Sequence, residues 1–195
     1  KGIALQLCDP PGGSYRSAAY AAIVKMRTVP ALVDGDFVLS ESDAIIEYLE
    51  DRFPEPSLRP ADLQRRAWMR FLGRFHDLHL EPPVRALFNE LPPATRNDDA
   101  VQARGAQIAD KLALLEGFLD PHGPFVVGAR PSLADCAYPA TLAIIERIAP
   151  ALRFAAPFGP RLARWREAVA AEPGFAAVLE PYQRDVDAWI ASRTR

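Results

Sequence analysis

Apolar residues are arranged differently in the two parts of this chain, and the difference predicts two kinds of secondary structure. Residues 31–33 and 37–39 are short apolar runs on either side of Asp34-Gly35. Two such runs predict a β-hairpin, because a tight turn needs a positive φ and glycine adopts it without steric cost. From residue 61 onward, apolar residues recur at helical spacing. The pattern therefore predicts a mixed α/β beginning followed by a helical remainder.

Three further elements are predicted around the hairpin. Residues 1–8 are a strand candidate, and the alanine-rich segment 17–26 predicts a short helix. Ser40 stands where a helix N-cap belongs, and Asp43 completes a capping box three positions later. The helix that follows has its apolar face at Ile45, Ile46, Leu49 and Phe53.

The helical part begins after a proline-rich segment, residues 54–60, whose composition is typical of an interdomain linker. Pro82-Pro83 is expected to kink or interrupt the first helix of this part, because proline removes a backbone donor. Ser132 and Asp135 form a second capping box. The run that follows it is apolar almost all round and should be the central helix. The predicted helices after the first are 97–118, 137–148, 161–171 and 175–190.

Composition excludes several classes of function. The chain has 195 residues, of which 49% are hydrophobic and 25% charged, with a net charge of −2. This charge gives no electrostatic reason to expect a nucleic-acid partner. No apolar run reaches the ~20 residues of a membrane helix, and no signal peptide is recognised at the start. We therefore expect a cytoplasmic protein.

The two cysteines and the three histidines carry little predicted chemistry. Cys8 and Cys136 are too few for a disulfide framework and suit a reducing compartment, where we expect both to be buried structural residues. His76 and His79 stand three positions apart on a predicted helix, but no third ligand follows at usable spacing. We therefore expect no metal site.

The start of the helix after the hairpin is a candidate anion site. A helix N-terminus offers unpaired N–H groups and a partial positive charge, and the Ser42 hydroxyl adds a donor. Pro30 begins its strand, which leaves the backbone groups of Val29 available to an extended peptide. A carboxylate pocket beside a peptide-pairing edge suits a small acidic peptide. Taken alone, Glu41-Ser42 would equally be ordinary polarity in the first turn of a helix.

Three motifs resemble those of a known family. Val29-Pro30-Ala31-Leu32, the Asp34-Gly35 turn and Glu41-Ser42 are similar to the glutathione-binding half of bacterial-type cytosolic glutathione S-transferases. The resemblance implies a thioredoxin-like α/β N-terminal domain over residues 1–53, here partial. It also implies a linker at 54–60 and an all-α helical-bundle C-terminal domain over 61–195. In that family, the N-terminal domain begins with one more strand and helix than this sequence contains.

The resemblance assigns candidate residues for binding glutathione, the expected co-substrate. It implies a cis Pro30, a Val29 backbone that pairs with the cysteinyl backbone, and Glu41 and Ser42 holding the γ-glutamyl carboxylate. Thr28 stands where the family often has a Lys or Gln that contacts glutathione. The catalytic residue stays unknown, because the family's thiol-activating Ser, Tyr or Cys belongs to the helix that this sequence lacks.

Asp77 is a further candidate in the helical part. In the resembled family, a carboxylate near this position can reach across a homodimer to the amino group of glutathione. The alternative is that Asp77 simply lies on a solvated helix face, and the residues alone leave both interpretations open.

The expected activity is conjugation of the glutathione thiolate to a hydrophobic electrophile, as in detoxification, by a homodimer. Two alternatives remain open. One is a glutathione-dependent isomerase or dehalogenase on the same scaffold. The other is a non-catalytic binding protein of the stringent starvation protein A type, a family that residues 47–54 also resemble.

Overall fold

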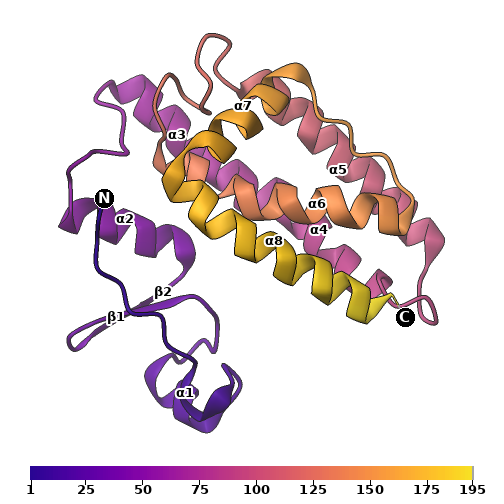
Figure 1. Cartoon of the computed structure of the whole chain (residues 1–195), viewed down its shortest axis with the longest axis horizontal. Coiled ribbons are helices and arrows are strands. Elements are labelled where there is room, and N and C mark those ends of the chain that lie inside the picture. The colour runs from indigo at the N-terminus through magenta and orange to yellow at the C-terminus, as the bar shows by residue number, and fades with distance from the viewer. Residues whose placement is uncertain (195) are drawn as a thin grey trace. The chain divides into compact units, whose positions relative to one another are not determined.

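The computed structural model describes residues 1–194 and divides into two compact units, residues 1–59 and 60–195 (Figure 1). The first unit combines a two-stranded sheet with helices, and the second is built from helices. The predicted fold class, a partial α/β domain followed by an all-helical domain, is therefore confirmed. Within residues 1–194, no helix has the length and apolar composition needed to cross a bilayer.

The first unit contains the predicted hairpin. The strands pair antiparallel, in a register that runs from Ala31 opposite Ser40 to Asp34 opposite Phe37. The turn lies one residue later than predicted, at Gly35-Asp36, and Gly35 has a φ of +60°. The elements of this unit are α1 (Ala18–Ile23), β1 (Ala31–Asp34), β2 (Phe37–Ser40) and α2 (Ser42–Arg52).

The predicted start of α2 is wrong by one residue. Ser40 is still paired with Ala31 in the hairpin, so it cannot act as the N-cap, and the capping box with Asp43 does not form. The N-cap is Glu41, which makes no side-chain cap hydrogen bond and has a φ of +76°. The chain therefore changes from strand to helix within one residue, in a backbone conformation that a non-glycine residue seldom adopts.

The predicted strand over residues 1–8 is not formed. This segment has no regular secondary structure, and the side chain of Leu7 is 96% exposed. A strand needs a neighbour for its backbone N–H and C=O groups. Among residues 1–194, the named strands pair only with each other. An apolar, extended sequence is therefore not sufficient to make a strand here.

The second unit follows the predicted helices closely. Asn97 caps α5 by accepting a hydrogen bond from the Ala100 N–H at 3.0 Å. The kink expected at Pro82-Pro83 takes the form of a π-helical turn over His76–Leu80, directly before these prolines. The helices are α3 (Leu63–Phe75), α4 (Glu81–Ala86), α5 (Asp98–Phe118), α6 (Tyr138–Leu152), α7 (Pro160–Ala171) and α8 (Pro173–Arg193).

Helix α6 is the core of the second unit, as its apolar sequence predicts. It packs against α4 and α8 (Figure 1). The apolar face predicted for α5 is also buried, and it consists of Val101, Ile108, Leu112, Leu115 and the neighbouring Leu119. Each such side chain contributes ~1.5–3 kcal/mol on burial, so this core holds the unit together.

Asp135 is a buried carboxylate that joins three segments of the second unit. Its capping box with Ser132 is present, as predicted. It accepts hydrogen bonds from the Ser132 N–H and hydroxyl at 2.8 and 2.7 Å, from the Val126 N–H at 3.0 Å and from Trp165 Nε1 at 2.7 Å. Its burial raises the pKa of the carboxyl, and the four donors oppose that shift.

Helix α7 is capped by a side chain from another helix. Glu116 near the end of α5 accepts hydrogen bonds from the N–H groups of Arg161 and Leu162, at 2.7 and 2.8 Å. A Cβ atom at Gly159 would lie 2.4 Å from the Glu116 carboxyl carbon, so glycine leaves the space for this carboxylate. The contact fixes where α7 begins.

The expectation that both cysteines are buried is wrong. Cys8 is exposed in the irregular segment 1–8. Cys136 is exposed as well, because residues 133–135 of the preceding turn take the buried positions. Neither thiol forms a disulfide.

Candidate functional site

The register of the hairpin brings the two predicted halves of the site together. Ala31 pairs with Ser40, so the residues just before β1 and just after β2 lie at the same end of the hairpin. Val29-Pro30 leads into β1 at this end, and Glu41-Ser42 leads out of β2. Segments about twelve residues apart in the sequence thus become neighbours, as a two-part binding site requires.

The Val29-Pro30 segment presents free backbone. The peptide bond between these residues is cis. The Val29 side chain is 57% exposed, and no hydrogen bond within residues 1–194 engages its N–H or C=O. Both groups are therefore available to an extended peptide, which could pair with them as a neighbouring strand does.

Thr28 is held in place by its backbone but not by its side chain. Its carbonyl oxygen accepts a hydrogen bond from the Tyr20 hydroxyl at 2.6 Å. Its own hydroxyl oxygen Oγ1 is buried and has no hydrogen-bond partner in the described part of the chain. Buried hydroxyls are normally bonded, so this unpartnered oxygen is an exception to that rule.

The start of α2 supplies the anion-binding half. The first helical hydrogen bond runs from the Ile45 N–H to the Glu41 carbonyl at 2.9 Å. The N–H groups of Ser42 and Ala44 and the exposed Ser42 hydroxyl have no partner within the described residues. These donors, at the positive end of the helix dipole, can hold a carboxylate.

Tyr20 is a positioning residue that the sequence analysis did not single out. It is buried on α1, and its hydroxyl hydrogen bond to Thr28 fixes the chain directly before the cis peptide. The available signal was an isolated tyrosine in an alanine-rich helix. A buried tyrosine normally finds a hydrogen-bond partner for its hydroxyl, but the sequence does not say which one.

Asp77 belongs to the second unit, whereas Thr28, Val29, Pro30, Glu41 and Ser42 belong to the first. Asp77 lies on the π-helical turn, with its side chain 36% exposed. Its carboxylate is 2.8 Å from Nδ1 of the buried His76 and 3.8 Å from the Arg74 guanidinium. Neighbouring side chains therefore orient this carboxylate.

His76 also contacts α6 through its other ring nitrogen. Its Nε2 lies 2.8 Å from the Thr141 hydroxyl oxygen. His79 instead lies with its ring centre 5.6 Å from that of Phe75. Residues 1–194 contain no cluster of three or more His, Cys, Asp or Glu side chains that could hold a metal ion. The two histidines are thus engaged in separate contacts.

Two family models match the chain. Residues 1–57 match "Glutathione S-transferase, N-terminal domain", and residues 98–168 match "Glutathione S-transferase, C-terminal domain". The first match includes the whole hairpin and the start of α2. The second covers α5, α6 and the first part of α7.

Individual proteins similar to this chain include glutathione S-transferases as well. A maleylacetoacetate isomerase of Pseudomonas aeruginosa is 34% identical, over 91% of this chain and 82% of its own length. Human glutathione S-transferase theta-1 is 34% identical, over 87% and 72%. A solved theta-class glutathione S-transferase of Xanthomonas axonopodis pv. citri with glutathione bound has a TM-score of 0.72 and 26% identity, and the match covers 90% of this chain and 80% of that one.

Proposed function

Since this chain belongs to the glutathione S-transferase family, we propose that it binds glutathione as a co-substrate and conjugates its thiolate to a hydrophobic electrophile. The family resemblance found in the sequence is thereby confirmed. The observation that carries the proposal is the register of the hairpin, with Ala31 opposite Ser40. It supports a site in which free peptide groups and an anion-binding helix start lie side by side.

Glutathione is an extended peptide with a carboxylate at each end, and the two halves of the site suit its γ-glutamyl and cysteinyl parts. The Val29 N–H and C=O would pair with the cysteinyl backbone. The Ser42 hydroxyl and N–H would bind the γ-glutamyl carboxylate. Thr28 is a candidate for a further contact with glutathione, and Tyr20 would keep that residue in position.

The proposed chemistry begins with the loss of the thiol proton. The thiolate is the nucleophile, so an enzyme of this kind must lower the pKa of the bound thiol toward neutral pH. The thiolate then forms a carbon–sulfur bond with the electrophile, and the displaced group leaves with the bonding electrons. None of the residues described above is assigned the role of thiol activation.

The isomerase alternative is retained because of the relative from Pseudomonas aeruginosa, whose match covers most of both chains. In that reaction, the thiolate would add to a carbon–carbon double bond and be expelled after rotation about the resulting single bond. Glutathione would be regenerated rather than consumed. The two activities would share the same binding site. They differ in whether the glutathione sulfur stays bonded to the product or is released again.

Two tests separate the candidate functions. Calorimetric titration of the full-length protein with glutathione should give a dissociation constant between about 1 μM and 1 mM, the usual range for enzyme substrates. With 1-chloro-2,4-dinitrobenzene as a test electrophile, a transferase consumes one thiol for each chloride released. Turnover of a cis double bond next to a carbonyl, without thiol loss, would establish the isomerase. A folded protein that binds no glutathione would contradict both and favour a non-catalytic binding protein.

Asp77 gives a prediction that also tests the homodimer. If the carboxylate approaches the amino group of a glutathione bound by the partner subunit, Asp77→Asn should weaken glutathione binding about 2- to 5-fold, as expected for an exposed ion pair. The asparagine oxygen can still accept a hydrogen bond from His76, so the fold should be kept. Calorimetry at low and high salt is the measurement, because screening should reduce the difference.

The matched control is Asp110→Asn, a charge removal at an exposed position on α5. Its glutathione affinity should equal that of the wild type. An Asp77→Asn protein with unchanged affinity at low salt would remove Asp77 from the site and leave it as a partner of His76. Sedimentation of both variants checks that the oligomeric state has not changed.

A further inference from the structure

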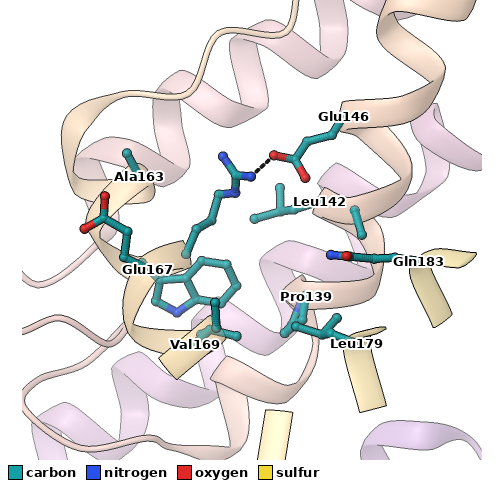
Figure 2. Close-up of a pocket in the computed structure, with 12 residues that line it drawn as sticks. Pro139, Leu142, Glu146, Ala163, Glu167, Val169, Leu179 and Gln183 are labelled. Atoms are coloured by element: carbon teal, nitrogen blue, oxygen red, sulfur yellow. Dashed lines mark ion pairs between the residues drawn. The ribbon is translucent and has the colours of Figure 1, made fainter. Parts of the chain in front are cut away.

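A pocket of about 300 Å³ lies within the second unit, between α6, α7 and α8 (Figure 2). Its lining runs from Pro139 on α6 to Gln183 on α8. None of the residues assigned to glutathione belongs to it. Its volume is at the lower end of the range that small-molecule pockets occupy, so it has room for a compact ligand.

The floor of this pocket is apolar. Leu142 of α6 and Val169 of α7 line it from opposite helices, and each is only 2% exposed. Leu179 of α8 closes it from the third side. Trp165 also contributes, and its Nε1–H is already bonded to Asp135, so only ring carbons remain for a ligand. Such a floor favours apolar groups.

The edge of the pocket carries one ion pair and one further carboxylate. Arg166 of α7 forms an ion pair with Glu146 of α6, drawn as a dashed line in Figure 2. The guanidinium also lies 5.0 Å from the centre of the Phe158 ring. Glu167 is exposed, and its carboxylate points away from Leu142 and Gln183 (Figure 2). A charged ligand would therefore find no unpaired opposite charge inside.

One polar side chain in the pocket is available for hydrogen bonding. Gln183 is half-buried and lies beside Leu142 and Pro139 in Figure 2. Its amide makes no hydrogen bond with any other residue in the stretch 1–194. A side-chain amide offers one acceptor oxygen and two donor hydrogens, so Gln183 can bond a hydroxyl, carbonyl or amide group.

We propose that this pocket is a second binding site, specific for a small, uncharged, mainly apolar molecule that carries one hydrogen-bonding group. The apolar part lies on Leu142, Val169 and Leu179, and the polar group bonds to Gln183. Binding requires none of the residues that hold glutathione. The site therefore works whether or not the protein is a transferase.

The test uses three probes of similar size: 4-propylphenol, propylbenzene and 4-propylbenzoate. Backbone amide shifts of the full-length protein are followed by NMR, with S-hexylglutathione present to fill the proposed transferase site. We expect 4-propylphenol to shift the amides of Val169, Leu179 and their neighbours. Propylbenzene should bind about fivefold more weakly, as the loss of one hydrogen bond predicts. The benzoate should bind at least tenfold more weakly than the phenol.

Two variants and a control make the test specific. Gln183→Leu should weaken binding of the phenol about fivefold and leave propylbenzene unchanged. Ala170→Phe fills the pocket and should abolish binding of both, whereas Ala171→Phe, at the next exposed position of α7 outside the lining, should not. If Ala170→Phe does not fold, the affinities of Gln183→Leu for 4-propylphenol and propylbenzene are sufficient to test the proposal.

Three results would overturn the proposal. The first is that millimolar 4-propylphenol does not shift the amides of the lining residues. The second is that Gln183→Leu binds 4-propylphenol and propylbenzene as the wild type does. The third is that 4-propylbenzoate binds as well as 4-propylphenol. Each result shows that the pocket does not select for an uncharged ligand through Gln183. None of them depends on whether the protein binds glutathione, so failure here is distinct from failure of the proposed function.

Discussion

Replacing Asp135 by alanine is expected to lower the free energy of unfolding by about 3–5 kcal/mol. The side chain is fully buried and accepts four hydrogen bonds, from Val126, Ser132 twice and Trp165. Each buried donor that loses its partner costs about 1–3 kcal/mol. Partial relaxation keeps the total below the simple sum. Urea unfolding monitored by circular dichroism is the measurement.

Asp62→Ala is the matched control for this prediction. Like Asp135, Asp62 accepts a backbone hydrogen bond at a helix start: it is the N-cap of α3 and accepts from the Arg65 N–H at 2.8 Å, but it is exposed. Loss of an exposed cap costs about 0.5–2 kcal/mol. A cost for Asp135→Ala as small as that of Asp62→Ala would show that the buried network adds nothing beyond capping.

Replacing Ser42 by alanine is expected to weaken glutathione binding by about 1–3 kcal/mol. This corresponds to a loss of affinity of about 5- to 150-fold. The variant would leave the γ-glutamyl carboxylate short of one donor in a partly desolvated site. The free protein should keep its stability, because the Ser42 side chain is exposed and has no partner among residues 1–194. Calorimetric titration measures the affinity, and thermal unfolding checks the stability.

Ser40→Ala, two residues earlier, is the control. Ser40 lies in β2, and its hydroxyl approaches only the Met26 sulfur, at 3.9 Å. This variant should bind glutathione as the wild type does. Equal losses of affinity in the two variants would show that serine at either position acts through the backbone of the hairpin, and Ser42 would then have no direct role.

The helical unit was predictable because its signals are local and repeated. Helix α5 spans twenty-one residues and has an apolar face repeated over its whole length, so the pattern fixes both its type and its buried side. The capping box at Ser132 needs only two residues three positions apart. Its wider network was not predictable, because Trp165 lies thirty residues away from Asp135. Glu116 and the start of α7 are a similar case, at separations of 45 and 46 residues.

The first unit shows where local reasoning fails. Residues 1–8 have an extended, apolar pattern, but a strand also needs a partner, and pattern alone does not supply one. The sequence around Ser40 is compatible with an N-cap and with the end of a strand. Because Ser40 pairs with Ala31, it is the end of the strand. The cysteines were assigned by residue type, whereas their exposure depends on which neighbours the turn buries.

The sequence predicted which residues form the candidate site, but not how they are arranged in space. Val29-Pro30 and Glu41-Ser42 were identified from sequence motifs, and the hairpin accounts for their proximity. The Tyr20 hydrogen bond and the unpartnered Thr28 hydroxyl required three-dimensional contacts between α1 and the segment before β1. The roles of these residues toward glutathione remain predictions, which Ser42→Ala and Asp77→Asn test.

The pairing of Ala31 with Ser40 also determines which changes of length this region can accept. One added residue in each strand would move the turn outward by about 3.3 Å and leave Val29 opposite the start of α2. A single addition to one strand would force a bulge or turn the following side chains onto the other face of the sheet. Insertions and deletions in the hairpin should therefore be tolerated in pairs, and a lone one should separate the two halves of the site.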